Sequence, residues 1–356
     1  MNINKKFDIM RTLLAIGIAL FISFLIIVLT SEEPLNAIIQ LITGPLQSKR
    51  RFGNVIEAMI PLIFTGVGVS IMFAANQINL AGEGAFHIGG LIATFVAINT
   101  TLPLGISPLV CIIVAGVFGA LVTVIPAILK IKTNSDVLVS SLMMNYIVFN
   151  FANYILNYFL RDSSAGSVVS YAVPQATQLN TIIQGTRIHI GLFIAIAVAI
   201  LGYIFLYKTK TGYEIRLTGE NQDFARYSGI NIVKVTLISA LLGGFIFGMG
   251  GGVELLGMYN RFSWTSQLGY GWDAIIITTL ARKNPLYVPF AAFFLAYLRT
   301  GASIMARSTD VVTEIVVITQ GIIILLVVAE QFLSKYKHKM IAKEAKATIS
   351  NIKEAE

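Results

Sequence analysis

Apolar stretches long enough to cross a lipid bilayer recur along most of this chain. A hydrocarbon core about 30 Å thick requires roughly 20 helical residues. Stretches that approach this length lie near 11–30, 54–75, 82–99, 107–129, 138–160, 188–207, 235–257, 271–282, 285–301 and 314–334. The sequence therefore predicts an all-α integral membrane protein, a bundle of about ten transmembrane helices, in which 271–282 is short for a full crossing.

The composition excludes a soluble globular protein. Hydrophobic residues make up 56% of the 356 residues and charged residues only 12%, which leaves too little polar surface to cover a soluble fold of this size. The net charge of +8 does not indicate nucleic-acid binding, because the basic residues stand at the ends of apolar runs and not on one solvated face. We therefore expect membrane lipid, and no nucleic acid, around this chain.

The distribution of basic residues predicts the orientation in the membrane. When the N-terminus is placed inside, most of the 26 lysines and arginines fall in interior segments, as cytoplasmic loops require. We expect a multi-pass protein of the cytoplasmic membrane with both termini in the cytoplasm. Residues 1–334 would form a single transmembrane domain, and residues 335–356 a basic and charged cytoplasmic tail.

Residues that usually bind metals or cofactors are sparse. The single cysteine, Cys111, lies within an apolar run, and His87, His189 and His338 are scattered. One cysteine allows neither a disulfide nor a thiolate metal site within the chain. The glycine-rich run near residue 248 is not followed by the Gly-Lys-Ser or Gly-Lys-Thr of a phosphate-binding loop. No cofactor, metal or catalytic residue is therefore expected.

The longest polar interior stretch, TGYEIRLTGENQDFARYSGI, covers residues 211–230. Phe224 and Tyr227 give it the pattern of a short amphipathic helix, and Asn221 is a residue typical of a helix N-cap. A helix of this kind in a cytoplasmic loop is suited to contact with a soluble partner. We predict a cytoplasmic coupling helix near 220–229.

A second polar segment, NQINLAGEGAFHIGG, lies at residues 76–90 between two predicted spans. It contains a carboxylate, amides and glycines, but no lysine or arginine that would mark an ordinary cytoplasmic loop. Non-helical backbone at membrane depth is tolerated where it is buried in protein or lines a cavity. The segment predicts a broken helix near 76–85, with Asn79 and Glu83 in a solute pathway. A tight turn stabilised by side-chain hydrogen bonds is the alternative.

Polar residues recur every four positions along the fifth predicted span. Ser141, Asn145, Phe149, Asn153 and Asn157 follow this spacing, which predicts that they share one helical face. Because amides are costly against lipid, we expect this stripe to face inward and to line a pathway for a neutral polar solute with a flat ring. Hydrogen bonding between neighbouring helices is the alternative role.

The same spacing recurs in glycines along the seventh predicted span. Gly244, Gly248 and Gly252 repeat every four residues. Small residues on one helical face allow another helix to approach closely. We predict a helix-packing face here.

Acidic residues near the ends of the spans do not form a catalytic pattern. Glu57, Glu254 and Asp273 lie near the predicted outer ends of three spans, and we expect them to be interfacial or docking charges. Paired carboxylates, Ser-His pairs and His-Asp pairs do not recur at helical spacing in this sequence. An intramembrane enzyme is therefore not expected.

Three segments resemble a known family of transport proteins. INLAGEG at 78–84, SSLMMNYI at 140–147 and GYEIRLTGENQDFARYSGI at 212–230 are similar to segments of the permease subunits of ATP-binding cassette (ABC) importers. That family includes transporters for branched-chain amino acids, ribose-type sugars and nucleosides, and the resemblance is closest to the nucleoside branch, of the simple-sugar type. Ala85 stands where the first motif usually has glutamine, and the third segment lacks a usual proline.

The resemblance implies an alternating-access importer for nucleosides. A separate cytoplasmic ABC ATPase would drive it, so the chain itself would not be an enzyme. An extracellular substrate-binding lipoprotein would deliver the solute, and a second homologous permease would complete a heterodimer. The residues that couple the chain to the ATPase would be Glu220, Asn221, Phe224, Ala225, Arg226, Tyr227, Gly229 and Ile230.

Two other functions remain open at this level. The same importer architecture could carry riboflavin or a ribose-type sugar. A different class, the ion-coupled secondary transporter, would also have many hydrophobic helices, although such carriers usually place ionisable residues in mid-helix. Glu83 is the strongest candidate for such a residue here.

Overall fold

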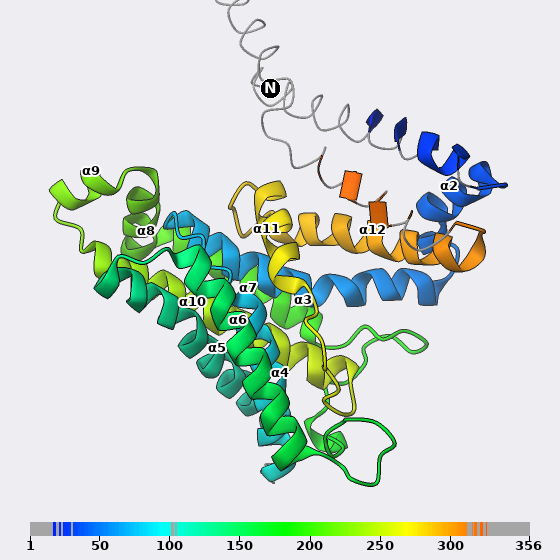
Figure 1. The fold of residues 1–356 in the computed structure, drawn as a ribbon, viewed down its shortest axis with the longest axis horizontal. Coiled ribbons are helices and arrows are strands. Elements are labelled where there is room, and N and C mark those ends of the chain that lie inside the picture. Colours follow the sequence, from blue (N-terminus) through cyan, green and yellow to red (C-terminus); the bar gives the residue numbers. More distant parts are fainter. Residues whose placement is uncertain are drawn as a thin grey trace, which may run out of the picture. The chain divides into compact units, whose positions relative to one another are not determined.

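The computed structural model describes residues 17–18, 21–22, 24–29, 31–100, 103, 105–311, 315, 317–318, 321–322 and 325. The predicted first span is therefore described only in part, and most of 314–334 and the whole tail 335–356 lie outside the described residues. Within those residues the chain is helical (Figure 1), and its β-structure is limited to two isolated bridges, Arg161 with Ser170 and Thr181 with His189.

Helices occupy the predicted spans from 54 to 301. In chain order the α-helices are α2 (Pro34–Thr43), α3 (Lys49–Ala74), α4 (Gly82–Asn99), α5 (Ile106–Thr133), α6 (Val137–Ile155), α7 (Gly191–Lys208), α8 (Lys210–Glu220), α9 (Gln222–Tyr227), α10 (Ile232–Met258), α11 (Tyr270–Leu280) and α12 (Val288–Ser308). Short 3-10 helices η1 (Gly44–Leu46) and η3 (Gln175–Thr177) and a π-helical turn η2 (Leu156–Leu160) complete the set. By length and composition α3, α5, α7, α10 and α12 could cross a membrane. The total of ten crossings stays a prediction.

The chain divides into two compact units. The smaller unit comprises residues 1–44 and 301–356. Its described core includes Ala37 and Leu41 on α2 and Met305 near the end of α12. The larger unit comprises residues 45–300 and contains the helices from α3 to α11.

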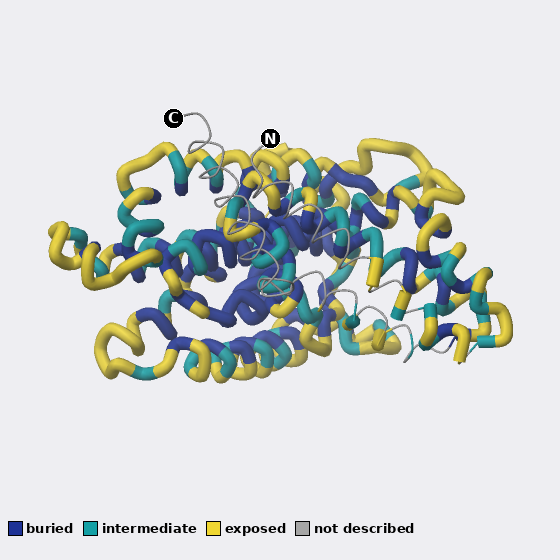
Figure 2. Tube along the Cα trace, turned by 90° about the horizontal axis from the view of Figure 1, so that it is seen from above, coloured by how far each residue is buried: buried dark blue, intermediate teal, exposed yellow. Residues whose placement is uncertain are grey.

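In the larger unit α10 packs against α3, α4 and α5. The apolar part of α3 is 89% buried, whereas that of α7 is 33% buried, so α3 is central and α7 peripheral. Figure 2 shows buried residues along the helices that pack together and exposed residues in the turns that connect them. The core of this unit is therefore built around α3 and α10.

The contact between α5 and α10 depends on glycines. A Cβ atom added at Gly248 would lie 2.2 Å from the carbonyl oxygen of Ala115, and one added at Gly244 would lie 2.5 Å from that of Gly119. A Cβ at Gly252 would lie 3.1 Å from the Cβ of Ala115. The backbones of the two helices therefore meet at a distance that larger side chains would prevent.

A long connection between α6 and α7 covers the end of α10. The backbone N–H of Ser170 donates to the carbonyl oxygen of Phe262 (3.0 Å), and that of Leu179 donates to Leu256 (2.9 Å). Arg261 forms an ion pair with Asp162 at 2.6 Å. The two backbone bonds satisfy carbonyl groups in and just after the last turn of α10, and the ion pair holds the connection beside them.

Candidate functional site

A helical corner lies at one end of the larger unit, where α7 is followed by α8 and α9 (Figure 1). The predicted short helix is present, and Asn221 caps it as expected, because its Oδ1 accepts a hydrogen bond of 2.9 Å from the N–H of Phe224. The helix ends at Tyr227, and Gly229 follows in the turn with a φ of +80°, which is accessible to glycine at little cost. Ile230 then donates its N–H to the carbonyl oxygen of Ala225.

The short helix α9 has faces of different character. Ala225 is fully buried, whereas Phe224 is 56% exposed and Tyr227 is 91% exposed. Gln222 and Arg226, one turn apart, lie along a groove described below. Exposed aromatic side chains on a short helix are typical anchors for a protein partner.

The preceding helix, α8, is seated against two other helices. A Cβ at Gly219 would lie 2.0 Å from the carbonyl oxygen of Ala74, the last residue of α3. Arg216 donates from Nε to the carbonyl oxygen of Leu206 at 2.9 Å, and its guanidinium lies 4.7 Å from the ring centre of Tyr207. Helix α8 is therefore in contact with the end of α3 and with α7.

Residues 75–81 join α3 to α4 without helical structure, and we call them the connector. Two residues of α6 bind it. Ser141 accepts a hydrogen bond from the N–H of Leu80 (3.0 Å), and Asn145 donates to the carbonyl oxygen of Leu80 (2.9 Å). Asn145 also accepts from the N–H of Gly84 (2.8 Å). One buried asparagine thus holds both the connector and the first turn of α4.

The connector is also bound by backbone groups of α5 and α10. Asn79 is fully buried and donates to the carbonyl oxygen of Thr123 (2.8 Å). Gln77 donates from Nε2 to the carbonyl oxygen of Thr236 (2.9 Å) and to the hydroxyl of Ser239 (2.8 Å). These bonds give Asn79, Ser141 and Asn145 a role in holding the connector, and their place in a solute pathway stays a prediction.

Glu83 lies in the first turn of α4, and its carboxylate binds the N-terminus of α11. Oε1 accepts from the N–H groups of Leu268 and Gly269, both at 2.8 Å, and Oε2 accepts from Gly271 at 2.5 Å. Gly269 has a φ of +84°, which turns the chain into the helix. A carboxylate is favoured at a helix N-terminus, where unpaired N–H groups converge. Glu83 therefore joins α4 to α11.

The residues of the polar stripe differ in burial along α6 and the π-helical turn η2 that follows it, and their place in a solute pathway stays a prediction. Ser141 and Asn145 are buried, Phe149 and Asn153 are intermediate, and Asn157 is exposed. An α-helix turns about 100° per residue, so a four-residue spacing drifts about 40° at each step. From Ser141 to Asn153 the stripe therefore turns away from the packed side of α6, and Asn157 lies beyond it in η2.

The acidic residues near the span ends are buried in protein, whereas interfacial or docking charges were expected. Glu57, Glu254 and Asp273 are all buried. Both carboxylate oxygens of Asp273 accept hydrogen bonds from Arg299, and Glu254 accepts one from the hydroxyl of Tyr270 at 3.3 Å. Burial of a carboxylate is tolerated when neighbouring helices supply such partners. The sequence pattern did not reveal those partners.

Two residues that the sequence analysis did not select contribute to the same site. Gln77 lies within the polar segment at 76–90. The segment was noted in the sequence, but no role was assigned to this residue. Thr123 lies in an apolar run, and its hydroxyl donates to the carbonyl oxygen of Ala240 on α10 at 2.7 Å. Only the crossing of α5 and α10 gives this threonine its role.

These features define a helical, multi-pass membrane protein with a projecting corner helix and a buried polar connector. Residues 51–328 match the family described as branched-chain amino acid transport system, permease component. The chain belongs to this family, whose members are transport components.

Known members of the family match most of this chain and most of their own length. The glucose ABC transporter permease protein TsgB13 of Haloferax volcanii is 28% identical across 95% of this chain and 94% of its own length. The guanosine ABC transporter permease protein NupP of Bacillus subtilis is 30% identical across 77% of this chain and 80% of its own length. The nucleoside ABC transporter permease protein NupB of Lactococcus lactis is 27% identical across 91% of this chain and 92% of its own length. Each of these organisms also has a second similar permease, TsgC13, NupQ and NupC respectively.

Proposed function

We propose that this chain is the transmembrane permease subunit of an ATP-driven importer that takes up nucleosides. A separate ATPase subunit would bind α9 on the cytoplasmic side, and both termini would lie on that side. The observation that carries this proposal is the α8–α9 corner, which exposes Phe224 and Tyr227 while α8 is seated against Ala74 of α3. Basic residues stand at the ends of helices around this corner, among them Lys130 and Lys208. Their presence agrees with a cytoplasmic location.

The contacts of the connector suggest how movement of the ATPase would reach the pathway. Closure of the ATPase would push α9 and α8 against the end of α3. The connector follows directly after Ala74 and is bound to α6 through Ser141 and Asn145. A shift at α8 would therefore change the position of α6. Some of the coupling residues would shape this corner, namely Glu220, Asn221, Ala225, Gly229 and Ile230. The others would form its contact surfaces, namely Phe224, Arg226 and Tyr227.

The open side of α6 is the part of the chain best suited to line the pathway. Tyr146, Asn150 and Tyr154 are exposed on α6, and Asn157 is exposed on the turn η2 that continues it. Amide side chains in mid-helix are costly against lipid, so this side would face a second permease with a water-filled route between the two subunits. Phe149 and Asn153 lie at its edge, and Asn79 and Glu83 would support the route from behind.

The relatives support a second permease as a partner. Because the similar permeases occur in pairs within one organism, we propose a heterodimer of two homologous permeases. A substrate-binding lipoprotein would dock at the opposite end of the pathway. Residues 1–334 would form the permease domain with ten crossings, broken near the connector, and residues 335–356 a cytoplasmic tail.

Nucleosides are the favoured cargo because NupP and NupB, named for guanosine and nucleosides, match most of this chain. Amides and aromatic rings on α6 suit such a cargo, since amides exchange hydrogen bonds with a base and rings stack on it. Glucose is the second candidate, because TsgB13 matches almost the whole chain. Membership of the permease family favours either importer over an ion-coupled carrier.

The coupling role is tested by the variant Tyr227→Asp in the complete transporter reconstituted into vesicles. We expect loss of ATPase co-purification and of ATP-dependent uptake of radiolabelled guanosine, because a charge replaces the most exposed aromatic anchor of α9. Tyr171→Asp is the control, since Tyr171 is an exposed tyrosine in the α6–α7 connection. Normal ATPase binding by Tyr227→Asp would contradict the proposal.

The cargo is tested in the same vesicles by competition. Unlabelled nucleosides should block guanosine uptake, whereas glucose, ribose and riboflavin should not. Uptake of glucose in place of guanosine would retain the importer and change its cargo. Uptake that runs on an ion gradient without ATP would overturn the importer itself.

A further inference from the structure

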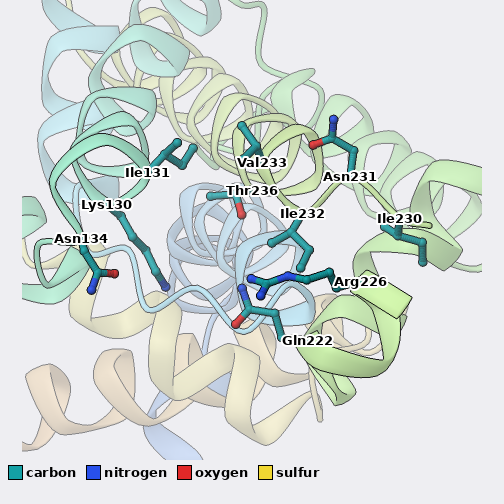
Figure 3. Close-up of a pocket in the computed structure, with 10 residues that line it drawn as sticks. All are labelled: Lys130, Ile131, Asn134, Gln222, Arg226, Ile230, Asn231, Ile232, Val233 and Thr236. Carbon is teal, nitrogen blue, oxygen red and sulfur yellow. The ribbon is translucent and has the colours of Figure 1, made fainter. Parts of the chain in front are cut away.

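An open groove of about 330 Å³ lies between the end of α5, the start of α10 and the inner side of α9 (Figure 3). It does not belong to the exposed aromatic surface of α9, because Phe224 and Tyr227 are not among its lining residues. The residues that line it are Lys130, Ile131, Asn134, Gln222, Arg226, Ile230, Asn231, Ile232, Val233 and Thr236.

The charged and polar side chains of the groove fit an anion. Lys130 and Arg226 extend toward the same space from opposite walls, and the amide of Gln222 lies beside Arg226 (Figure 3). None of the ten lining residues is acidic, so the two positive charges are not balanced within the groove. Asn134 and Asn231 add further amides. Charged donors and amides around one space are the groups that bind phosphate oxygens.

The apolar residues of the groove point to the kind of anion. Ile131, Ile232 and Val233 line it alongside the polar groups. Just before it on α5, Ile125, Ile128 and Leu129 are exposed. Because α5 is one of the helices long and apolar enough to cross the membrane, its exposed apolar residues are suited to contact with acyl chains. A molecule that occupies both surfaces would carry a phosphate next to acyl chains.

We propose that this groove binds the headgroup of an anionic phospholipid, with the acyl chains lying along α5. Lys130 and Arg226 would bind the phosphate from opposite sides, and Gln222 and Asn134 would donate hydrogen bonds to it. A bound lipid would then connect α9 to α5 and α10, and would hold the corner helix at a fixed distance from the membrane. The side of α9 with Phe224 and Tyr227 would remain accessible to a soluble partner.

The test measures binding of radiolabelled phosphatidylglycerol to the purified full-length chain in neutral detergent, with phosphatidylcholine as the uncharged comparison. The double variant Lys130→Gln, Arg226→Gln should lower the affinity for phosphatidylglycerol by roughly 30-fold, since each basic side chain contributes to binding an anionic lipid. The double variant Lys208→Gln, Lys210→Gln is the matched control. It removes two exposed lysines at the same end of the molecule but outside the groove, and its affinity should stay within about twofold of wild type.

A second measurement reports folding and binding together. Phosphatidylglycerol should raise the midpoint of thermal unfolding of the wild type and of the control, but not that of the groove variant. Without lipid, the groove variant should unfold at the same midpoint as the wild type, because both substituted side chains are exposed. Equal loss of binding in the control would overturn the proposal in favour of general surface charge. Displacement of the lipid by inorganic phosphate would assign the groove to a free anion. Unchanged lipid binding with loss of ATPase co-purification would assign it to the ATPase.

Discussion

Glu83 belongs to α4 but performs its main task at α11, where its two carboxylate oxygens accept three backbone N–H groups. Glu83→Gln replaces one acceptor oxygen with an NH₂ group that cannot accept, so at least one N–H is left unpaired. We expect a loss of roughly 1 to 3 kcal/mol in the free energy of unfolding, measured by chemical denaturation in detergent. Glu214→Gln makes the same change on α8 and is the control. Equal stability of the two variants would mean that Glu83 does not secure α11.

The ion pair of Asp162 predicts how the stability of the protein changes at low pH. Hydrogen bonds from Ser164, together with Arg261 at 2.6 Å, lower the pKa of Asp162 from 3.8 to about 2. A carboxyl group whose pKa is lower in the folded state stabilises that state above its ordinary pKa, and the stabilisation is lost as the pH falls from about 4 to about 2. We expect the midpoint of thermal unfolding to fall more steeply over this range in the wild type than in Asp162→Asn. Parallel curves would show that this ion pair does not stabilise the loop.

At the scale of one element, α6 carries similar amides with different tasks. Asn145 is buried and binds Leu80 and Gly84, whereas Asn150 is exposed and donates to the carbonyl oxygen of Tyr146 within its own helix. Asn145→Leu leaves buried backbone groups unpaired and should cost roughly 2 kcal/mol or more in stability. Asn150→Leu should leave stability within about 0.5 kcal/mol and reduce uptake of radiolabelled guanosine in the reconstituted transporter. The reverse pattern would place the pathway on the packed side of α6.

At the scale of the whole molecule, the proposed pairing makes α6 line a water-filled route. Cys111 is the only cysteine and is buried, so an introduced thiol can be labelled selectively. We expect Asn150→Cys to react with a water-soluble maleimide in the assembled transporter. Leu201→Cys, on the exposed side of the peripheral helix α7, should react slowly because lipid surrounds it. Equal rates at the two positions would contradict a route along α6.

The sequence by itself determined the class of protein, the helices from 54 to 301 and the short helix near Asn221, because hydropathy and helix capping depend on residues close together in the chain. Only the tertiary structure decided where the polar side chains of those helices go. Glu83 binds Leu268, and Asn145 binds Leu80, across long separations in the sequence. A periodic pattern states which residues share a helical face, but not which neighbour that face meets, and for α6 the four-residue period drifted from the packed side to the open one. The cost of burying a carboxylate or an amide is known from the residue alone, whereas the partner that offsets this cost is supplied by the fold.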